Sequence, residues 1–187
     1  DDVWHRRIAH WSRYYSGMGV YALHRAIQRE NLPYAFTAFS RSLKWAMELG
    51  FMLNRVYFPY DKWLYSFFKK LPKLTDSMVP LIETAIKEDT SWRKRLEILN
   101  NISDLLDTEM VKLKIIPQHP KFLGNESSGY RLLEHAYGSI IKQLPHEIKH
   151  HVPCWDQIFL EEFHTGYVDS ISLDEWNKVL CLTPTKV

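Results

Sequence analysis

Residues 33–56 constrain the fold of this chain more than any other stretch. Apolar side chains cover nearly the whole surface of the helix that their three- and four-residue spacing predicts. They are Phe36, Phe39, Leu43, Met47 and Leu53 on one stripe, with Ala35, Ala38, Trp45, Leu49 and Met52 beside it. A helix that is apolar on almost every side lies at the centre of a bundle. We therefore expect other helices to surround this one.

Helical periodicity in the rest of the chain predicts an all-α fold. A first helix is expected over about residues 2–31, where Gly17 and Gly19 weaken the middle by about 1 kcal/mol each and indicate a kink or a close helix crossing. Further helices are expected over about residues 61–70, 77–88, 92–116 and 130–143. We expect a single helical domain over residues 1–187. It would comprise a mostly antiparallel bundle over about residues 1–145 and short C-terminal helices within about 153–182.

Composition argues against several functional classes. The formal net charge of +2 is nearly balanced, so nucleic acid is not an expected partner. No run approaches the ~20 apolar residues of a membrane span. Cys154 and Cys181 are too few for a disulfide framework and match no metal spacing, so a reducing cytoplasm is the default location. The first residues do not resemble a signal peptide and look like the interior of a helix. We therefore expect the chain to be a piece of a longer protein.

Residues 54–63, Asn-Arg-Val-Tyr-Phe-Pro-Tyr-Asp-Lys-Trp, are an unusual way to end a helix. Pro59 has no amide proton and biases Phe58 away from the α region. The stretch holds four aromatic residues, two cations, an amide and a carboxylate, whereas a plain turn needs little more than Gly, Asn or Ser. One interpretation is a hydrophobic helix corner with capping polar groups, and the other is a surface that binds a substrate.

The second interpretation gives these side chains roles in binding. A guanidinium binds phosphate as a fork and an ammonium binds it as a point charge. Aromatic rings stack on a base or a sugar, and an amide can fix a ligand's orientation. The candidate substrate-binding residues are Arg41, Asn54, Arg55, Tyr57, Tyr60, Lys62 and Trp63.

A narrow polar stripe on the predicted helix 33–56 leads towards this corner and consists of Arg41, Lys44, Glu48 and Arg55. In one interpretation the stripe is an exposed face with helical ion pairs, each worth about 0.2–0.5 kcal/mol. In the other it lies in a cleft, where Glu48 would be a general base if burial raised its pKa towards the working pH. Glu48 is therefore the candidate catalytic residue.

Three histidines follow Pro145, namely His146, His150 and His151. The segment His-Glu-Ile-Lys-His that starts at His146 matches the two-histidine pattern of zinc proteases. A third ligand is not evident, and Pro145 and Pro153 bound a segment too short for the long active-site helix of those enzymes. We expect a solvated connector here and no metal site.

Residues 51–63 carry the pattern Leu-Asn-Arg-x-Tyr-x-Pro-Tyr-x-Lys-Trp, and Leu71 and Pro72 follow it. This pattern resembles the helical part of an uncharacterised family catalogued as domain of unknown function 4037. Residues 11–29 are similar to that family too, and together the resemblance covers roughly the first 75 residues. Members of the family look like nucleotidyltransferases. The resemblance therefore implies a preceding α/β domain with a Gly-Ser element and paired acids that hold Mg²⁺, and a helical domain that helps to form the acceptor site, as in aminoglycoside nucleotidyltransferases.

The chain departs from this pattern because it contains no Gly-Ser followed by an Asp-x-Asp pair. We therefore expect the helical substrate-binding domain of a nucleotidyltransferase-like protein, which assists nucleotidyl transfer to an unknown acceptor. No cofactor is expected in this chain. Mg²⁺ and a nucleotide would come with the α/β domain of the same natural chain, and the substrate would be a small molecule or a nucleotide. The alternative is a non-enzymatic helical interaction module with the aromatic corner as a protein-docking patch.

Overall fold

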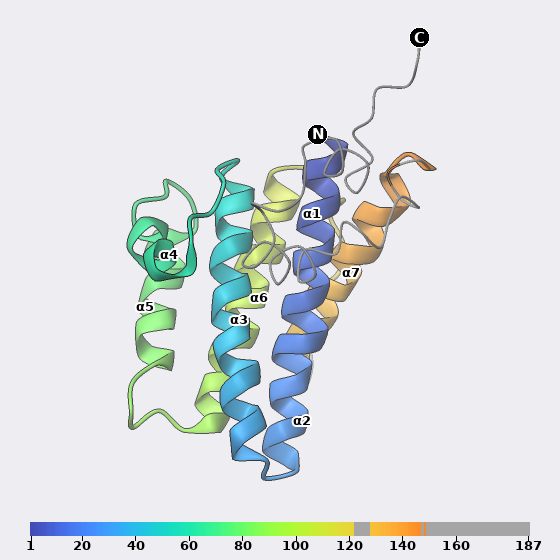
Figure 1. Cartoon of the computed structure of the whole chain (residues 1–187). Helices are drawn as coiled ribbons and strands as arrows, with labels where there is room; N and C mark the ends of the chain where they lie inside the picture. Colours follow the sequence, from blue (N-terminus) through green and yellow to red (C-terminus); the bar gives the residue numbers. More distant parts are fainter. Residues whose placement is uncertain (122–127, 147, 149–187) are drawn as a thin grey trace, which may run out of the picture. The chain divides into compact units, whose positions relative to one another are not determined.

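The computed structural model describes residues 1–121, 128–146 and 148, and it shows only helices and their connections in them. The helices are α1 (Asp2–Arg13), the π-helix η1 (Tyr14–Tyr21), α2 (Ala22–Gln28), α3 (Leu32–Leu53), α4 (Asp61–Phe68), α5 (Thr75–Ala85), α6 (Trp92–Lys112) and α7 (Ser128–Gln143) (Figure 1). The predicted all-α fold is confirmed. The short helices predicted within 153–182 lie outside the described residues. Among the described helices, none combines the length and the apolar character that crossing a bilayer requires.

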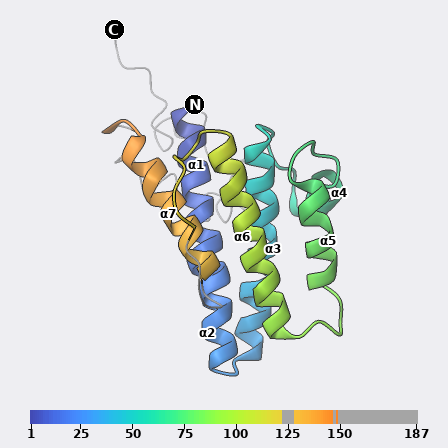
Figure 2. The ribbon, with the colours of Figure 1, turned by 180° about the vertical axis from the view of Figure 1, so that it is seen from behind.

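The helix predicted over residues 2–31 forms, but its middle is wound as a π-helix. α1, η1 and α2 follow one another without a break, and η1 packs on α3 and α7 (Figures 1 and 2). At Gly19 the helix crosses α3 so closely that an added Cβ would lie 2.6 Å from the Ser42 hydroxyl oxygen. The predicted close crossing is thus confirmed at Gly19. The π winding has no counterpart in the sequence pattern, because the apolar spacing does not distinguish it from an α-helix.

The predicted central helix is α3, which contacts α2, η1, α4 and α6. Most of its side chains are buried, including Leu49, Met52 and Leu53 at 0–1% exposure. Phe36 is an exception, because it is 60% exposed and meets Trp92 edge-on with the ring centroids 4.7 Å apart. The helix therefore supplies the core along most of its length and loses that role near its N-terminus.

α3 ends at Leu53, earlier than predicted, because the chain turns into the left-handed region at Arg55, where φ is 59°. The amide of Arg55 donates to Met52 O at 3.0 Å, and the amide of Val56 donates to Phe51 O at 3.1 Å. This is the Schellman arrangement, which usually places Gly at the left-handed position. Arg55 takes it at a cost of about 1–2 kcal/mol, and the chain then runs into the segment that precedes α4.

α4 is held on α3 by a close ring contact. Phe68 is fully buried, and a Cβ added at Gly50 would lie only 2.5 Å from its ring. The Phe51 and Phe68 ring centroids are 6.2 Å apart, and Leu64 is 3% exposed. The side of α4 that carries Leu64 and Phe68 is therefore fixed to α3, whereas Trp63 and Phe67 remain about half exposed.

α6 packs on α3, α5 and α7 (Figure 2). It starts where predicted, with the Ser91 hydroxyl accepting from the amide of Lys94 at 3.2 Å. It ends at Lys112, earlier than the predicted 116, because Lys114 has a φ of 58° and turns the chain away. The connection that follows runs back along α6 towards α7 (Figure 2).

Candidate functional site

The segment between α3 and α4 exposes the aromatic residues that the sequence singled out. Tyr57 is 76% exposed, Tyr60 is 70% exposed and Trp63 is 51% exposed. Lys62 is exposed beside them, with its Nζ 5.4 Å from the centroid of the Trp63 ring. We call these four residues the corner surface. In the part of the chain that the structure describes, no hydrogen bond ties either tyrosine hydroxyl or the Trp63 indole to another protein atom.

Arg55 lies at the N-terminal edge of this corner and is engaged with α1. Its guanidinium is 5.8 Å from the centroid of the Trp4 ring and 2.7 Å from the Asp1 carboxylate. The Trp4 indole donates to Met52 O at 2.9 Å and meets Tyr57 edge-on at 5.4 Å. Because the Asp1–Arg55 pair is exposed, it is worth little in water, so a phosphate group can compete for this cation.

The Asn54 side chain, a candidate for orienting a ligand, is hydrogen-bonded to the backbone. Its Nδ2 donates to Gly50 O at 2.7 Å and to Lys73 O at 3.3 Å, and its Oδ1 accepts from the Lys73 amide at 3.1 Å. All these partners are backbone atoms. The Asn54 amide therefore ties the end of α3 to the connection between α4 and α5.

A chain of polar contacts leads inward from the start of α4. The Lys44 ammonium lies 3.1 Å from Asp61 Oδ2 and 3.8 Å from Glu48 Oε1. The Trp11 indole donates to Glu48 Oε2 at 2.7 Å. We call Trp11, Lys44, Glu48 and Asp61 the Glu48 cluster. It links a buried carboxylate on α3 to the residue that directly precedes Lys62 of the corner surface.

The interpretation of the polar stripe as a uniformly exposed face is wrong at Glu48, whose side chain is only 1% exposed. Trp11 supplies an N–H and Lys44 supplies a positive charge, and a buried carboxylate requires both kinds of partner. The rest of the stripe does not stay together, because Arg41 is exposed on α3 and Arg55 turns to Asp1. An ion pair four residues apart on a helix usually lies at the surface, which is why the sequence favoured exposure.

α1 and the first residue of η1 contribute two cluster neighbours that the sequence did not assign to the site. The Arg7 guanidinium lies 5.6 Å from the Trp11 ring and 5.7 Å from the Phe58 ring, and those two rings are 5.9 Å apart. Tyr14 lies 5.8 Å from both Trp11 and Trp45. The signal in the sequence was the helical spacing of Arg7, Trp11 and Tyr14, which places a cation and two aromatic residues on one face.

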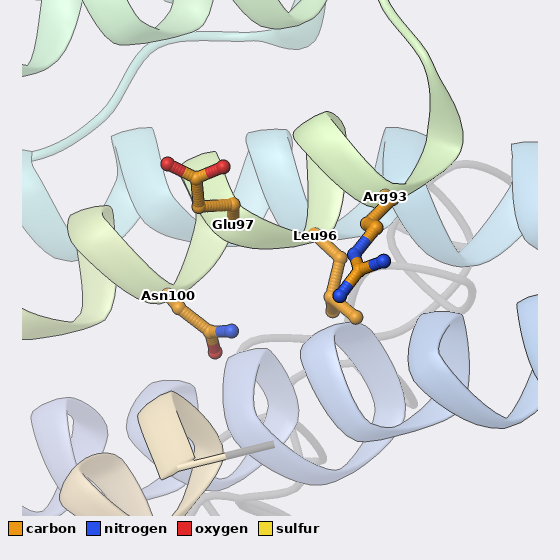
Figure 3. Close-up of a pocket in the computed structure, with 4 residues that line it drawn as sticks. All are labelled: Arg93, Leu96, Glu97 and Asn100. Atoms are coloured by element: carbon orange, nitrogen blue, oxygen red, sulfur yellow. The ribbon is translucent and has the colours of Figure 1, made fainter. Parts of the chain in front are cut away.

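A groove along α6 lies away from this site. It has a volume of about 240 Å³ and is lined by Arg93, Leu96, Glu97 and Asn100 (Figure 3). In Figure 3, Arg93 and Asn100 point towards the neighbouring helices, whereas Glu97 points the other way. Ligand pockets usually measure about 300–1,000 Å³, and no candidate residue lines this groove, so we do not assign it as the site.

The histidine-rich segment gives no metal centre that the structure can describe. Within residues 1–121, 128–146 and 148, no three His, Cys, Asp or Glu side chains gather closely enough to hold a metal ion. Glu147, which lies between His146 and His150 in the motif, is outside the described residues, and so are His150 and His151. The expectation of no metal site therefore stays a prediction.

Comparison with known proteins gives one positive result. No curated protein and no solved structure matches the chain. The family model described as Domain of unknown function (DUF4037) matches residues 1–64, which include α1, η1, α2, α3 and the corner surface. That description carries no activity. Over its first 64 residues, the chain therefore matches the domain of unknown function 4037 family, and the resemblance carried by the Asn-Arg-x-Tyr-x-Pro-Tyr-x-Lys-Trp motif is confirmed.

Proposed function

We propose that this chain is the helical substrate-binding domain of a nucleotidyltransferase-like protein and that the corner surface holds the substrate. One observation carries the proposal: Tyr57, Tyr60 and Trp63 all expose their rings in the short segment that follows the central helix, and the Lys62 ammonium lies over the Trp63 ring. Large exposed apolar side chains that form a continuous patch mark binding surfaces, and this short segment places three exposed aromatic residues close together in the sequence. The same residues lie within the part of the chain that matches the family.

The chemistry of the corner suits a nucleotide or a phosphorylated substrate. Tyr57, Tyr60 and Trp63 offer rings for stacking on a base or sugar, which is worth about 1–3 kcal/mol per base. Lys62 offers a positive charge for phosphate oxygens. Mg²⁺ would be held by paired acids of an α/β domain, and this helical domain would contribute orientation and charge neutralisation instead of covalent catalysis.

Within the Glu48 cluster, the carboxylate that solvent reaches is Asp61, whose side chain is 61% exposed. Glu48 lies beneath Lys44 and fixes its ammonium towards Asp61. We therefore propose that Glu48 positions Lys44 and that Asp61 is the group of this cluster that meets an acceptor hydroxyl. We propose these two roles in place of the hypothesis that Glu48 itself is the general base.

A second candidate function is a protein-docking module without catalysis. It is favoured by the further exposure of Val56 at 42% and of Phe67 at 47%, which adds apolar side chains before and after the corner residues. Aromatic residues at the centre of such a patch are typical anchors of protein interfaces.

Calorimetric titration of the longest natural protein with Mg·ATP and with aminoglycosides tests the first function. We expect Tyr60→Ala and Lys62→Ala each to weaken binding by about tenfold, which corresponds to about 1.4 kcal/mol. Both side chains are exposed, so the free energy of unfolding should change by no more than about 0.5 kcal/mol.

Two control variants match these residues in type and exposure. Tyr34 is 46% exposed near the other end of α3, and Lys87 is exposed after α5, so Tyr34→Ala and Lys87→Ala should bind as the unmodified protein does. Wild-type affinity in both corner variants would reject the substrate-binding role. If neither ligand binds and the corner variants instead lose a protein partner, the docking module is the correct function.

A further inference from the structure

α4 and the turn after it carry a local excess of positive charge. Residues 62–73 contain no acid and four lysines, namely Lys62, Lys69, Lys70 and Lys73. Among the described side chains, no carboxylate forms an ion pair with any of these lysines. Asp61, the acid that directly precedes them, is paired with Lys44 at 3.1 Å. The nearly balanced charge of the whole chain therefore hides an uncompensated basic segment.

Three ring–ammonium pairs follow one another along this segment. They are Lys62 with Trp63 at 5.4 Å, Lys69 with Tyr65 at 4.8 Å and Lys70 with Phe67 at 5.0 Å, each measured from Nζ to the ring centroid. Trp63 and Phe67 are about half exposed. The outer side of α4 thus presents positive charges and aromatic rings next to one another, and it continues from the corner surface.

The backbone beneath these side chains is held in place from three directions. Phe68 packs on Phe51 of α3, the Tyr65 hydroxyl donates to Glu83 of α5 at 2.7 Å, and Asn54 binds the backbone of Lys73. Figures 1 and 2 show α4 at the edge of the bundle, on the opposite side of α3 from α1. A ligand that runs along α4 therefore meets side chains on a supported and accessible helix.

This combination of groups favours a single strand of nucleic acid over other polyanions. Each nucleotide of a strand brings a phosphate and a base, so it engages a cation and an aromatic ring together. A duplex keeps its bases stacked on one another and would leave the rings unused. An anionic bilayer takes up apolar side chains that point away from the charged face of a helix, whereas here an ammonium group lies over each of the three rings.

We propose that the substrate held at the corner surface is a single-stranded nucleic acid whose phosphates run along α4 over Lys62, Lys69 and Lys70. Lys62 and Lys70 are eight residues apart, which is about 12 Å along a helix and leaves room for more than one phosphate. The bases stack on the rings of the corner surface and on Phe67. This inference rests on the function proposed above, because it names the class of the substrate.

Fluorescence anisotropy with labelled oligouridine and oligothymidine of about ten nucleotides tests the inference on the longest natural protein. We expect both strands to bind, and the logarithm of the affinity should fall against the logarithm of the salt concentration with a slope of about −2, as for about three neutralised phosphates. The double variant Lys69→Ala/Lys70→Ala should bind about tenfold more weakly at low salt, with the slope reduced in size by about 1.4. Lys69→Arg/Lys70→Arg keeps both charges and should restore most of the affinity.

Two further variants separate charge from stacking. Phe67→Ala removes a ring without a charge, so it should weaken binding by about fivefold or more and leave the salt slope unchanged. Lys87→Ala/Lys94→Ala removes two exposed lysines away from α4 and should leave both the affinity and the slope unchanged. Equal losses in this control and in Lys69→Ala/Lys70→Ala would show general charge attraction and overturn the inference. Tighter binding to vesicles of phosphatidylserine and phosphatidylcholine than to either strand would overturn it too.

Titration of the same variants with Mg·ATP separates this inference from the proposed function. Lys69 and Lys70 lie outside the corner surface, so Lys69→Ala/Lys70→Ala should bind Mg·ATP as the wild type does. If Mg·ATP binding depends on Tyr60 and Lys62 but neither strand binds, the inference is wrong and the proposed function stands. If both strands bind through Lys69 and Lys70 while Mg·ATP does not bind, the nucleotidyltransferase function is wrong and the strand-binding surface stands.

Discussion

Replacing Trp11 with alanine should lower the free energy of unfolding by about 3–5 kcal/mol. Trp11 is 1% exposed and packs against Phe58 and Tyr14. Its indole also donates to the buried Glu48 carboxylate at 2.7 Å. The variant therefore leaves a cavity and removes the hydrogen bond that compensates a buried charge. Urea unfolding at equilibrium measures the loss, and an unchanged m-value would indicate that the denatured state is unaffected.

Two milder variants divide this loss into its parts. Trp11→Phe keeps much of the ring volume but removes the N–H, and we expect it to cost about 1–3 kcal/mol. Glu48→Gln keeps an oxygen that accepts from Trp11 and removes the charge that faces Lys44, so it should cost less than Trp11→Phe. If Trp11→Phe unfolds as the wild type does, the hydrogen bond does not stabilise the fold and the Glu48 cluster is not held as described.

Replacing Phe68 with alanine should cost a similar amount, about 3–5 kcal/mol, and should also loosen α4 from α3. Phe68 is fully buried, and its ring lies against the place where Gly50 has no side chain. α4 starts at Asp61, so the same change should disturb Lys62 and Trp63 on its first turn. We expect unfolding to become easier and binding at the corner surface to weaken together.

The matched control is the next residue along the chain. Phe67 is 47% exposed, so Phe67→Ala should change stability by no more than about 0.5 kcal/mol. Gly50→Ala places a Cβ 2.5 Å from the Phe68 ring and should cost about 1–3 kcal/mol through overpacking. Combining Gly50→Ala with Phe68→Leu should cost less than the sum of the two, because leucine vacates the space that the new methyl needs. Additive losses would show that the two positions do not share this contact.

The helices could be predicted from the sequence because their apolar periodicity is strong. The central position of α3 follows from a stripe that covers almost every side of the helix, and the structure buries it accordingly. Helix ends were predicted less well. α2, α3 and α6 are each followed by a left-handed residue that is not glycine, namely Glu30, Arg55 and Lys114, so the usual glycine signal was missing.

The contacts that shape the candidate site could not be predicted, because they join residues far apart in the chain. Trp11 and Glu48 are 37 residues apart, and Asn54 and Lys73 are 19 residues apart. A Lys-Glu pair four residues apart on a helix gives no sign that the Glu will be buried under an indole from another helix. The corner surface was easier to predict, because its rings are exposed by the local end of α3 and need no distant partner to identify them.

Oxidative footprinting of the longest natural protein, with and without saturating Mg·ATP, measures most directly whether the aromatic residues of the corner face a ligand. We expect ligand to reduce labelling at Tyr57, Tyr60 and Trp63 and to leave Tyr34 unchanged. Unchanged labelling of all three rings while the nucleotide is demonstrably bound would contradict the proposal that this corner is the substrate-binding surface.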